Sequence, residues 1–158
     1  MAKQHVFECE GQWNGALMRG KGQFRTGSLQ GEFSVPRDMT GPGVGTNPEE
    51  LLVAAAHTCY LMTLSALLSA EGVSYNELSN RTSAIFDSAP QGPVLVALQH
   101  APVVRMAPDA RMLFGGTVQS CMLQAETACM VAKTMAGNVT VKVQGRVEAA
   151  LETAGTRP

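Results

Sequence analysis

The sequence predicts an α+β fold that combines an antiparallel sheet with two long helices. The first observation is the order of hydrophobic patterns, which runs strands, helix, strands, helix, strand. The second is a strong helix start followed by a long apolar stretch, and the third is a cleanly alternating segment at 139–143 that closes the fold. A length of 158 residues suits one domain, so we expect 1–158 to form a single domain.

The first third of the chain carries strand and loop signals. Residues 4–35 alternate polar and apolar side chains among glycines, which predicts two or three antiparallel strands. Residues 36–45 contain two prolines and three glycines, so we expect a loop there.

A helix is predicted over 47–71. Asn47 or Thr46 can cap it, Pro48 fits the first helical position, and two glutamates in the first turn match the helix dipole. Gly72 is a suitable stop.

The second half predicts strands at roughly 80–87 and 94–106, joined by a turn at 89–93. A second helix begins at Asp109 or Thr117 and continues to Gly137, with the pair Gly115-Gly116 as a weak point. The alternating segment 139–143 is the last predicted strand.

The first predicted helix has an apolar surface that one subunit cannot cover. Residues 51–70 carry no formal charge, which meets the length test for a membrane span, but polar side chains inside the run and glutamates at both ends favour a soluble helix. Such a helix is about 36 Å long, whereas a globule of this size has a radius of gyration of about 15 Å. Together with a charged fraction of only 16%, this predicts a homodimer and no membrane partner.

Composition excludes several classes of function. A net charge of −1 provides no field for nucleic acid. The first ten residues hold no apolar signal-peptide core, so we expect a cytoplasmic protein, in which a disulfide framework is disfavoured. The spacing of the four cysteines fits no zinc pattern, and no phosphate-binding glycine loop or metal-ligand cluster is present, so we expect no cofactor.

Two cysteines are candidates for redox chemistry. Cys59 and Cys129 each lie mid-helix in the predicted elements and are flanked by alanines. Small residues would let the two helices approach to the Cα separation of roughly 4.4–6.8 Å that a disulfide needs. The alternative is that both are buried apolar thiols. We interpret Cys121 and Cys9 as structural, because Cys121 lies about 12 Å from Cys129 along one helix and Cys9 has no companion signal.

A reactive Cys59 needs a group that favours its thiolate. It lies beyond the reach of the dipole of its own helix, so Arg37 is the first candidate and Arg19 the second, although either could be a solvated surface charge. Glu49 is ten residues before Cys59, about 15 Å along the helix and on another face. It could orient an arginine only across a dimer or from a folded-back loop, or it could simply match the helix dipole. His57 points away from Cys59, and we interpret it as a core or interface histidine.

The sequence resembles the OsmC/Ohr family, the osmotically inducible and organic hydroperoxide resistance proteins. The resemblance is carried by the segment 45–59, from Gly-Thr-Asn-Pro-Glu-Glu-Leu-Leu to His-Thr-Cys, and by Ala-Cys-Met-Val at 128–131 followed by 137–141. It covers roughly residues 8–150. Met130 stands where many members have proline, and the choice between Arg37 and Arg19 differs among subgroups.

The resemblance implies an intertwined homodimer in which each subunit has an antiparallel sheet wrapped on two long central helices, with two active sites at the dimer interface. It identifies Cys59 as the peroxidatic cysteine, Cys129 as the resolving cysteine, and Arg37 and Glu49 as their partners, supplied at least in part across the dimer. It also implies reduction of organic hydroperoxides through a Cys59–Cys129 disulfide, with a lipoylated protein or a similar dithiol as reductant. Two alternatives remain open: a cysteine-based redox sensor, and a non-catalytic module that binds a small hydrophobic ligand.

Overall fold

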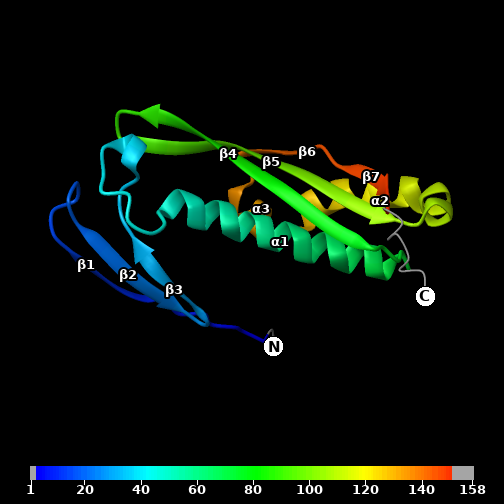
Figure 1. The fold of residues 1–158 in the computed structure, drawn as a ribbon, viewed down its shortest axis with the longest axis horizontal. Helices are drawn as coiled ribbons and strands as arrows, with labels where there is room; N and C mark the ends of the chain where they lie inside the picture. Colours follow the sequence, from blue (N-terminus) through cyan, green and yellow to red (C-terminus); the bar gives the residue numbers. More distant parts are fainter. Residues whose placement is uncertain (1–2, 151–158) are drawn as a thin grey trace, which may run out of the picture. The chain divides into compact units, whose positions relative to one another are not determined.

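The computed structural model describes residues 3–150, and these belong to two compact units, Met1–Leu52 and Val53–Pro158. The expectation of one domain stays a prediction. Each unit has its own sheet, of three strands in the first and of a long hairpin with two short strands in the second (Figure 1). The predicted α+β class is therefore confirmed.

The first unit is a three-stranded antiparallel sheet, followed by a loop and the start of a helix. Its strands are β1 (Glu10–Asn14), β2 (Lys21–Thr26) and β3 (Leu29–Phe33), in the order β1-β2-β3. Their register places Trp13, Gly22 and Phe33 side by side, and a Cβ on Gly22 would collide with the ring of Phe33. Glycine at this position therefore makes room for aromatic packing on one face of the sheet. The loop holds a short 3-10 turn, η1 (Arg37–Met39).

Helix α1 (Pro48–Ala70) forms where the sequence predicts it. The backbone N–H of Glu50 donates to Oδ1 of Asn47 at 2.8 Å, so Asn47 is the cap. Gly72 ends the helix with a φ of 66°, and the N–H of Val73 donates to the carbonyl of Leu68, the geometry of a glycine C-cap.

The second unit packs α1 and α2 against a mixed sheet. The hairpin of β4 (Glu77–Ala89) and β5 (Gly92–Met106) is longer at most ends than the predicted strands, and α2 spans Pro108–Ala128. The core joins Tyr60, Leu64 and Leu68 of α1 to residues of β5 and α2 (Val104, Met106, Val118, Cys121, Met122 and Ala125). This shared core keeps α1 and α2 close enough for side chains of one to contact the other.

Two features of the second sheet correct the sequence-based expectation. Strand β6 (Thr140–Val143) lies parallel to β5, not antiparallel, and an unpredicted strand, β7 (Arg146–Ala149), also pairs in parallel with β5. A parallel neighbour requires a long crossover. The helical segment between β5 and β6 provides it, so the chain returns to the sheet in the same direction.

The second predicted helix is also corrected. It does not weaken at Gly115-Gly116 but breaks at Cys129, giving α2 and a short α3 (Met130–Met135). Cys129 has φ −59° and ψ 126°, an extended conformation, so the expectation that it lies mid-helix is wrong. Ala110 and Phe114 before the glycines and Val118 after them pack on the same core, which holds α2 together across the pair.

Candidate functional site

The structure brings together the two cysteines that the sequence singled out. Sγ of Cys129 lies 2.8 Å from Sγ of Cys59, and both thiols are free. A disulfide is about 2.05 Å long, so a small movement would join them. Cys129 is 1% exposed, whereas Cys59 is only half-buried. Of the two sulfurs, Cys59 is therefore the one that an incoming reagent can reach.

The two thiols differ in acidity. Burial acts to raise the pKa of Cys59, but the hydrogen bond from the Cys129 thiol and those from the backbone N–H groups of Val131 and Met130 outweigh it, so the pKa is lowered. Burial raises the pKa of Cys129, and its hydrogen bond to Cys59 raises it further. The pair therefore favours a thiolate on Cys59 and a protonated thiol on Cys129, and the thiolate is the nucleophilic form.

The break in the helix supplies these backbone donors. In an unbroken helix the N–H groups of Met130 and Val131 would bond to carbonyls one turn earlier. The extended conformation of Cys129 frees them, because α3 begins at Met130 and its first N–H groups have no partner within the helix. Sequence reasoning considered only a cation near the thiolate and missed these backbone donors, because residues 125–132 contain no glycine or proline to signal the break.

Thr63 also acts near Cys59. Its hydroxyl donates to the backbone carbonyl of Cys59 at 2.8 Å, and its side chain contributes to the lowered pKa of the thiol. It lies one helical turn after Cys59 on the same side of α1. No sequence signal distinguishes it from other helix threonines.

Arg37, Glu49 and Arg19 belong to the first unit, whereas both thiols belong to the second. Arg37 is exposed in η1, and its side chain lies so close over Gly43 that a Cβ there would stand 2.9 Å from Nε. Oε2 of Glu49 is buried and has no hydrogen-bond partner within residues 3–150. None of these three side chains makes an ion pair in that part of the chain. Their action on Cys59 stays a prediction.

The other two cysteines have different environments. Cys121 is 2% exposed in the core, where burial and then the charge of Glu71 raise the pKa of its thiol. Cys9 is exposed, just before β1 in the first unit. The environment of Cys121 is that of a packing residue.

A buried polar network lies next to the cysteine pair, and sequence reasoning missed it. Oγ1 of Thr82 is 3.0 Å from Nδ1 of His57 and 2.9 Å from Nδ1 of His100, and Nδ2 of Asn80 donates to the same oxygen at 3.0 Å. His57 comes from α1, Asn80 and Thr82 from β4, and His100 from β5. His100 is 2% exposed and stacks on Tyr60 with ring centroids 4.3 Å apart. The network therefore joins the Cys59 turn of α1 to the sheet.

The network predicts a loss of stability in mild acid. Burial, and next the nearby His57, lower the pKa of His100 to about 4. As the pH falls, such a histidine takes up a proton in the unfolded chain before it does so in the folded one. The free energy of unfolding therefore has its full value above pH about 6.5 and decreases as the pH drops towards 4. The expected decrease is about 3 kcal/mol for this single group. Urea unfolding between pH 7.5 and 4.5 measures it. A His100→Phe variant, which keeps the stack on Tyr60, should show a shallower pH dependence; equal slopes would contradict the assignment.

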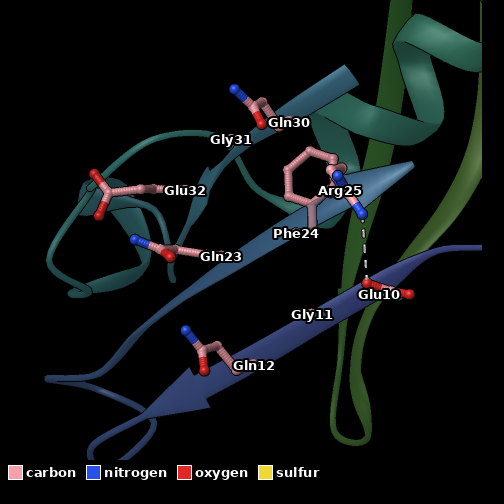
Figure 2. A pocket seen from close by; sticks show the side chains of 9 residues that line it. All are labelled: Glu10, Gly11, Gln12, Gln23, Phe24, Arg25, Gln30, Gly31 and Glu32. Carbon is pink, nitrogen blue, oxygen red and sulfur yellow. Dashed lines mark ion pairs between the residues drawn. The ribbon is translucent and has the colours of Figure 1, made fainter. Parts of the chain in front are cut away.

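Cavities lie on the first sheet, against α1 and β4, and against α2, α3 and β6, and no cysteine lines any of these three. One of about 640 Å³ is an open hollow on the first sheet, lined by polar side chains of all three strands such as Gln12, Gln23 and Glu32 (Figure 2). Its charged groups are satisfied within the sheet, for example by the ion pair of Glu10 with Arg25 at 3.8 Å. It contains no cysteine or histidine, so it offers no nucleophile.

Comparison with known proteins agrees with the sequence resemblance. The family described as OsmC-like protein matches residues 41–144. The uncharacterized protein YmaD of Bacillus subtilis (strain 168) is 30% identical over 144 residues, which cover 91% of this chain and 95% of YmaD. Peroxiredoxin OsmC of Escherichia coli (strain K12) is 27% identical over 135 residues, covering 84% of this chain and 91% of that protein.

Solved structures share the fold. The crystal structure of an organic hydroperoxide resistance protein OsmC from Legionella pneumophila has a TM-score of 0.71 and 20% sequence identity, and the match covers 92% of this chain and 99% of that chain. An organic hydroperoxide resistance protein from Elizabethkingia anophelis gives a TM-score of 0.72 at 16% identity, covering 95% and 100%. The family match extends over most of the chain and includes both Cys59 and Cys129. The chain belongs to the OsmC-like protein family.

Proposed function

We propose that this protein is a cytoplasmic, thiol-dependent peroxidase that reduces organic hydroperoxides to alcohols in an oxidative or osmotic stress response. Family membership supports a peroxidase or redox role, since one relative is named peroxiredoxin OsmC. The observation that carries the finer proposal is the Cys59–Cys129 pair, with sulfurs 2.8 Å apart and pKa shifts of opposite sign. A pair that only packed in a core would need neither an accessible sulfur nor donors for a thiolate.

The chemistry begins with attack of the Cys59 thiolate on one peroxide oxygen. The O–O bond breaks, the sulfur is oxidised to sulfenic acid, and the alkoxide leaves and takes up a proton to become an alcohol. The Cys129 thiol then attacks the Cys59 sulfenic acid, giving a disulfide and water. Two thiols are oxidised for each hydroperoxide reduced. Cys129 must lose its proton for this step, and oxidation of Cys59 removes the thiolate charge that helps to raise the pKa of Cys129.

Arg37 and Glu49 are proposed to complete the site. The cationic Arg37 would stabilise the negative charge that grows on the leaving oxygen, and Glu49 would hold the guanidinium in place. The unpartnered buried oxygen of Glu49 supports this role, because a buried carboxylate without a donor is costly. Arg19 is the second choice for the cation.

An external dithiol, such as a lipoylated protein, is proposed to restore the thiols by exchange with the disulfide. The substrates are proposed to be fatty or aromatic hydroperoxides, because burial of each CH₂ against an apolar helix contributes about 0.8 kcal/mol. Steady-state turnover tests both points: cumene hydroperoxide with dihydrolipoamide should turn over faster than hydrogen peroxide with the same dithiol. A single oxidation without recycling by any dithiol would instead indicate a redox sensor.

A homodimer is proposed to cover α1. The helix is long and apolar enough to cross a membrane, as the core helix of a soluble protein can also be, with a mean hydropathy of 1.8 over its best window. Only 22% of that window is buried within the subunit, and Met62 is 74% exposed. An apolar helix left this open needs a partner, and a second copy is the occupant that the incomplete environment of Glu49 favours.

A charge placed on the exposed face of α1 should therefore split the dimer. Met62→Lys is expected to halve the mass measured by light scattering at micromolar concentration, because it would bury an unpaired ammonium at the interface. Ser88→Lys, on the exposed end of β4, adds the same charge and should leave the mass unchanged. A wild-type protein that is already a monomer would refute the dimer.

A further inference from the structure

One turn of α1 is held on three sides. His57 contacts Thr82 of β4, Tyr60 stacks on His100 of β5, and the Tyr60 hydroxyl donates to the carbonyl of Met122 in α2 at 2.9 Å. Successive helix residues are 100° apart, so His57 and Cys59 point to different flanks with Tyr60 between them. The same turn thus carries the anchors on one side and the reactive sulfur on the other.

The single hydrogen of the Thr82 hydroxyl restricts how the two histidines can bond to it. The Thr82 hydroxyl has one hydrogen, so it can donate to the Nδ1 of one histidine and must accept from the Nδ1–H of the other. Asn80 Nδ2 lies 3.3 Å from Nδ1 of His100 and 3.5 Å from that of His57. The Thr82 hydroxyl therefore couples the two histidines, because one ring must carry its proton on Nδ1 and the other on Nε2 for both contacts to be hydrogen bonds.

The network also has a cost that fold stability alone does not explain. Oδ1 of Asn80 is buried without a hydrogen-bond partner within residues 3–150. A leucine or valine at this place would pack without leaving such a group. These four polar residues lie beside a reactive thiol although one of their oxygens is unsatisfied. This indicates that they serve to hold the thiol in a defined position.

We propose that His57 and Thr82 are positioning residues for the cysteine pair: their hydrogen bond fixes the rotation of α1 and so holds the Cys59 sulfur against Cys129 and the N–H groups of α3. The proposal rests on the function proposed above in one respect only: that function is the reason why the two cysteines must be held together. A side-chain atom about 5 Å from the axis moves about 1.3 Å when a helix turns by 15°. A displacement of about 1 Å can cost about 100-fold in a reaction between two positioned groups.

The test is the equilibrium between the Cys59–Cys129 disulfide and dithiothreitol, which needs no peroxide. Thr82→Val keeps the shape of the side chain and removes the hydroxyl, so the equilibrium constant for disulfide formation should fall by about 10-fold to 100-fold. Thr82→Ser restores the hydroxyl and should recover the wild-type value. A purely structural hydrogen bond would lower the melting temperature but leave this equilibrium in the folded molecules unchanged.

A second pair of variants keeps the test decisive if Thr82→Val does not fold. His57→Leu removes the ring nitrogen that bonds to Thr82, and His57→Asn can place an amide group near the position of Nδ1. The proposal predicts a weakened disulfide in the first and recovery in the second. Equilibrium constants within threefold of wild type in folded Thr82→Val or His57→Leu would overturn it. A wild-type protein that forms the disulfide readily but ignores hydroperoxides would refute the peroxidase function alone.

Discussion

Replacing Cys59 with serine is expected to abolish the reduction of cumene hydroperoxide. Cys59 carries the accessible thiolate, and serine offers no comparable nucleophile. Removing the nucleophile of a well-studied hydrolase costs on the order of 10⁶ in kcat, so a fall of at least about 10³-fold, to the uncatalysed background, is expected here. Peroxide consumption at constant dithiol concentration measures it.

Cys129→Ser should behave differently from Cys59→Ser. It keeps the attacking thiolate but removes the resolving thiol, so one hydroperoxide is consumed per subunit and the Cys59 sulfenic acid persists until a reagent traps it. Cys121→Ser is the matched control, because it changes another buried thiol, which lies in α2. Full turnover by Cys59→Ser, or loss of the first oxidation in Cys129→Ser, would exclude the assigned roles.

Replacing Met130 with proline is expected to raise the pKa of Cys59. Proline lacks the N–H that Met130 donates to the thiolate. Hydrogen bonds to charged groups are stronger than those between neutral groups, so the loss of this donor moves the pKa of Cys59 upward. The fold should tolerate the change, since proline suits the first position of α3 and the extended Cys129 suits the position before a proline.

The pH dependence of Cys59 alkylation measures this effect. Iodoacetamide labelling followed by peptide mass separates Cys59 from the other thiols, and Met130→Ala is the control because it loses the side chain and keeps the N–H. The midpoint should move upward only in Met130→Pro. Identical profiles for the two variants would show that the backbone donor does not control the thiolate.

Local sequence signals predicted much of the fold. Asn47, Pro48 and Gly72 mark the ends of α1 through backbone chemistry that depends only on near neighbours, and the structure follows them. The four residues of β7 give too short an alternation to identify a strand. The parallel pairing of β6 depends on the route of the chain through α2 and α3, which periodicity does not record.

The candidate site, like the fold, could be predicted only in part from local sequence. Alanines beside Cys59 and Cys129 indicated that the helices could approach, and the sulfurs do meet. The break at Cys129 could not be foreseen, because Ala128 and Met130 are good helix formers and give no local signal for a helix end. His57 and His100, which both contact the hydroxyl of Thr82, are 43 positions apart in the sequence, and no local pattern predicts that they meet there. The donors that act on Cys59 are therefore visible only in three dimensions.

The peroxidase proposal is tested most directly by one single-turnover experiment. Reduced protein is mixed with one equivalent of cumene hydroperoxide, free thiols are followed in time, and the product is mapped by peptide mass. The account predicts rapid loss of two thiols per subunit and a single link between Cys59 and Cys129. Slow loss of thiols, or a link that involves Cys9 or Cys121, would contradict it.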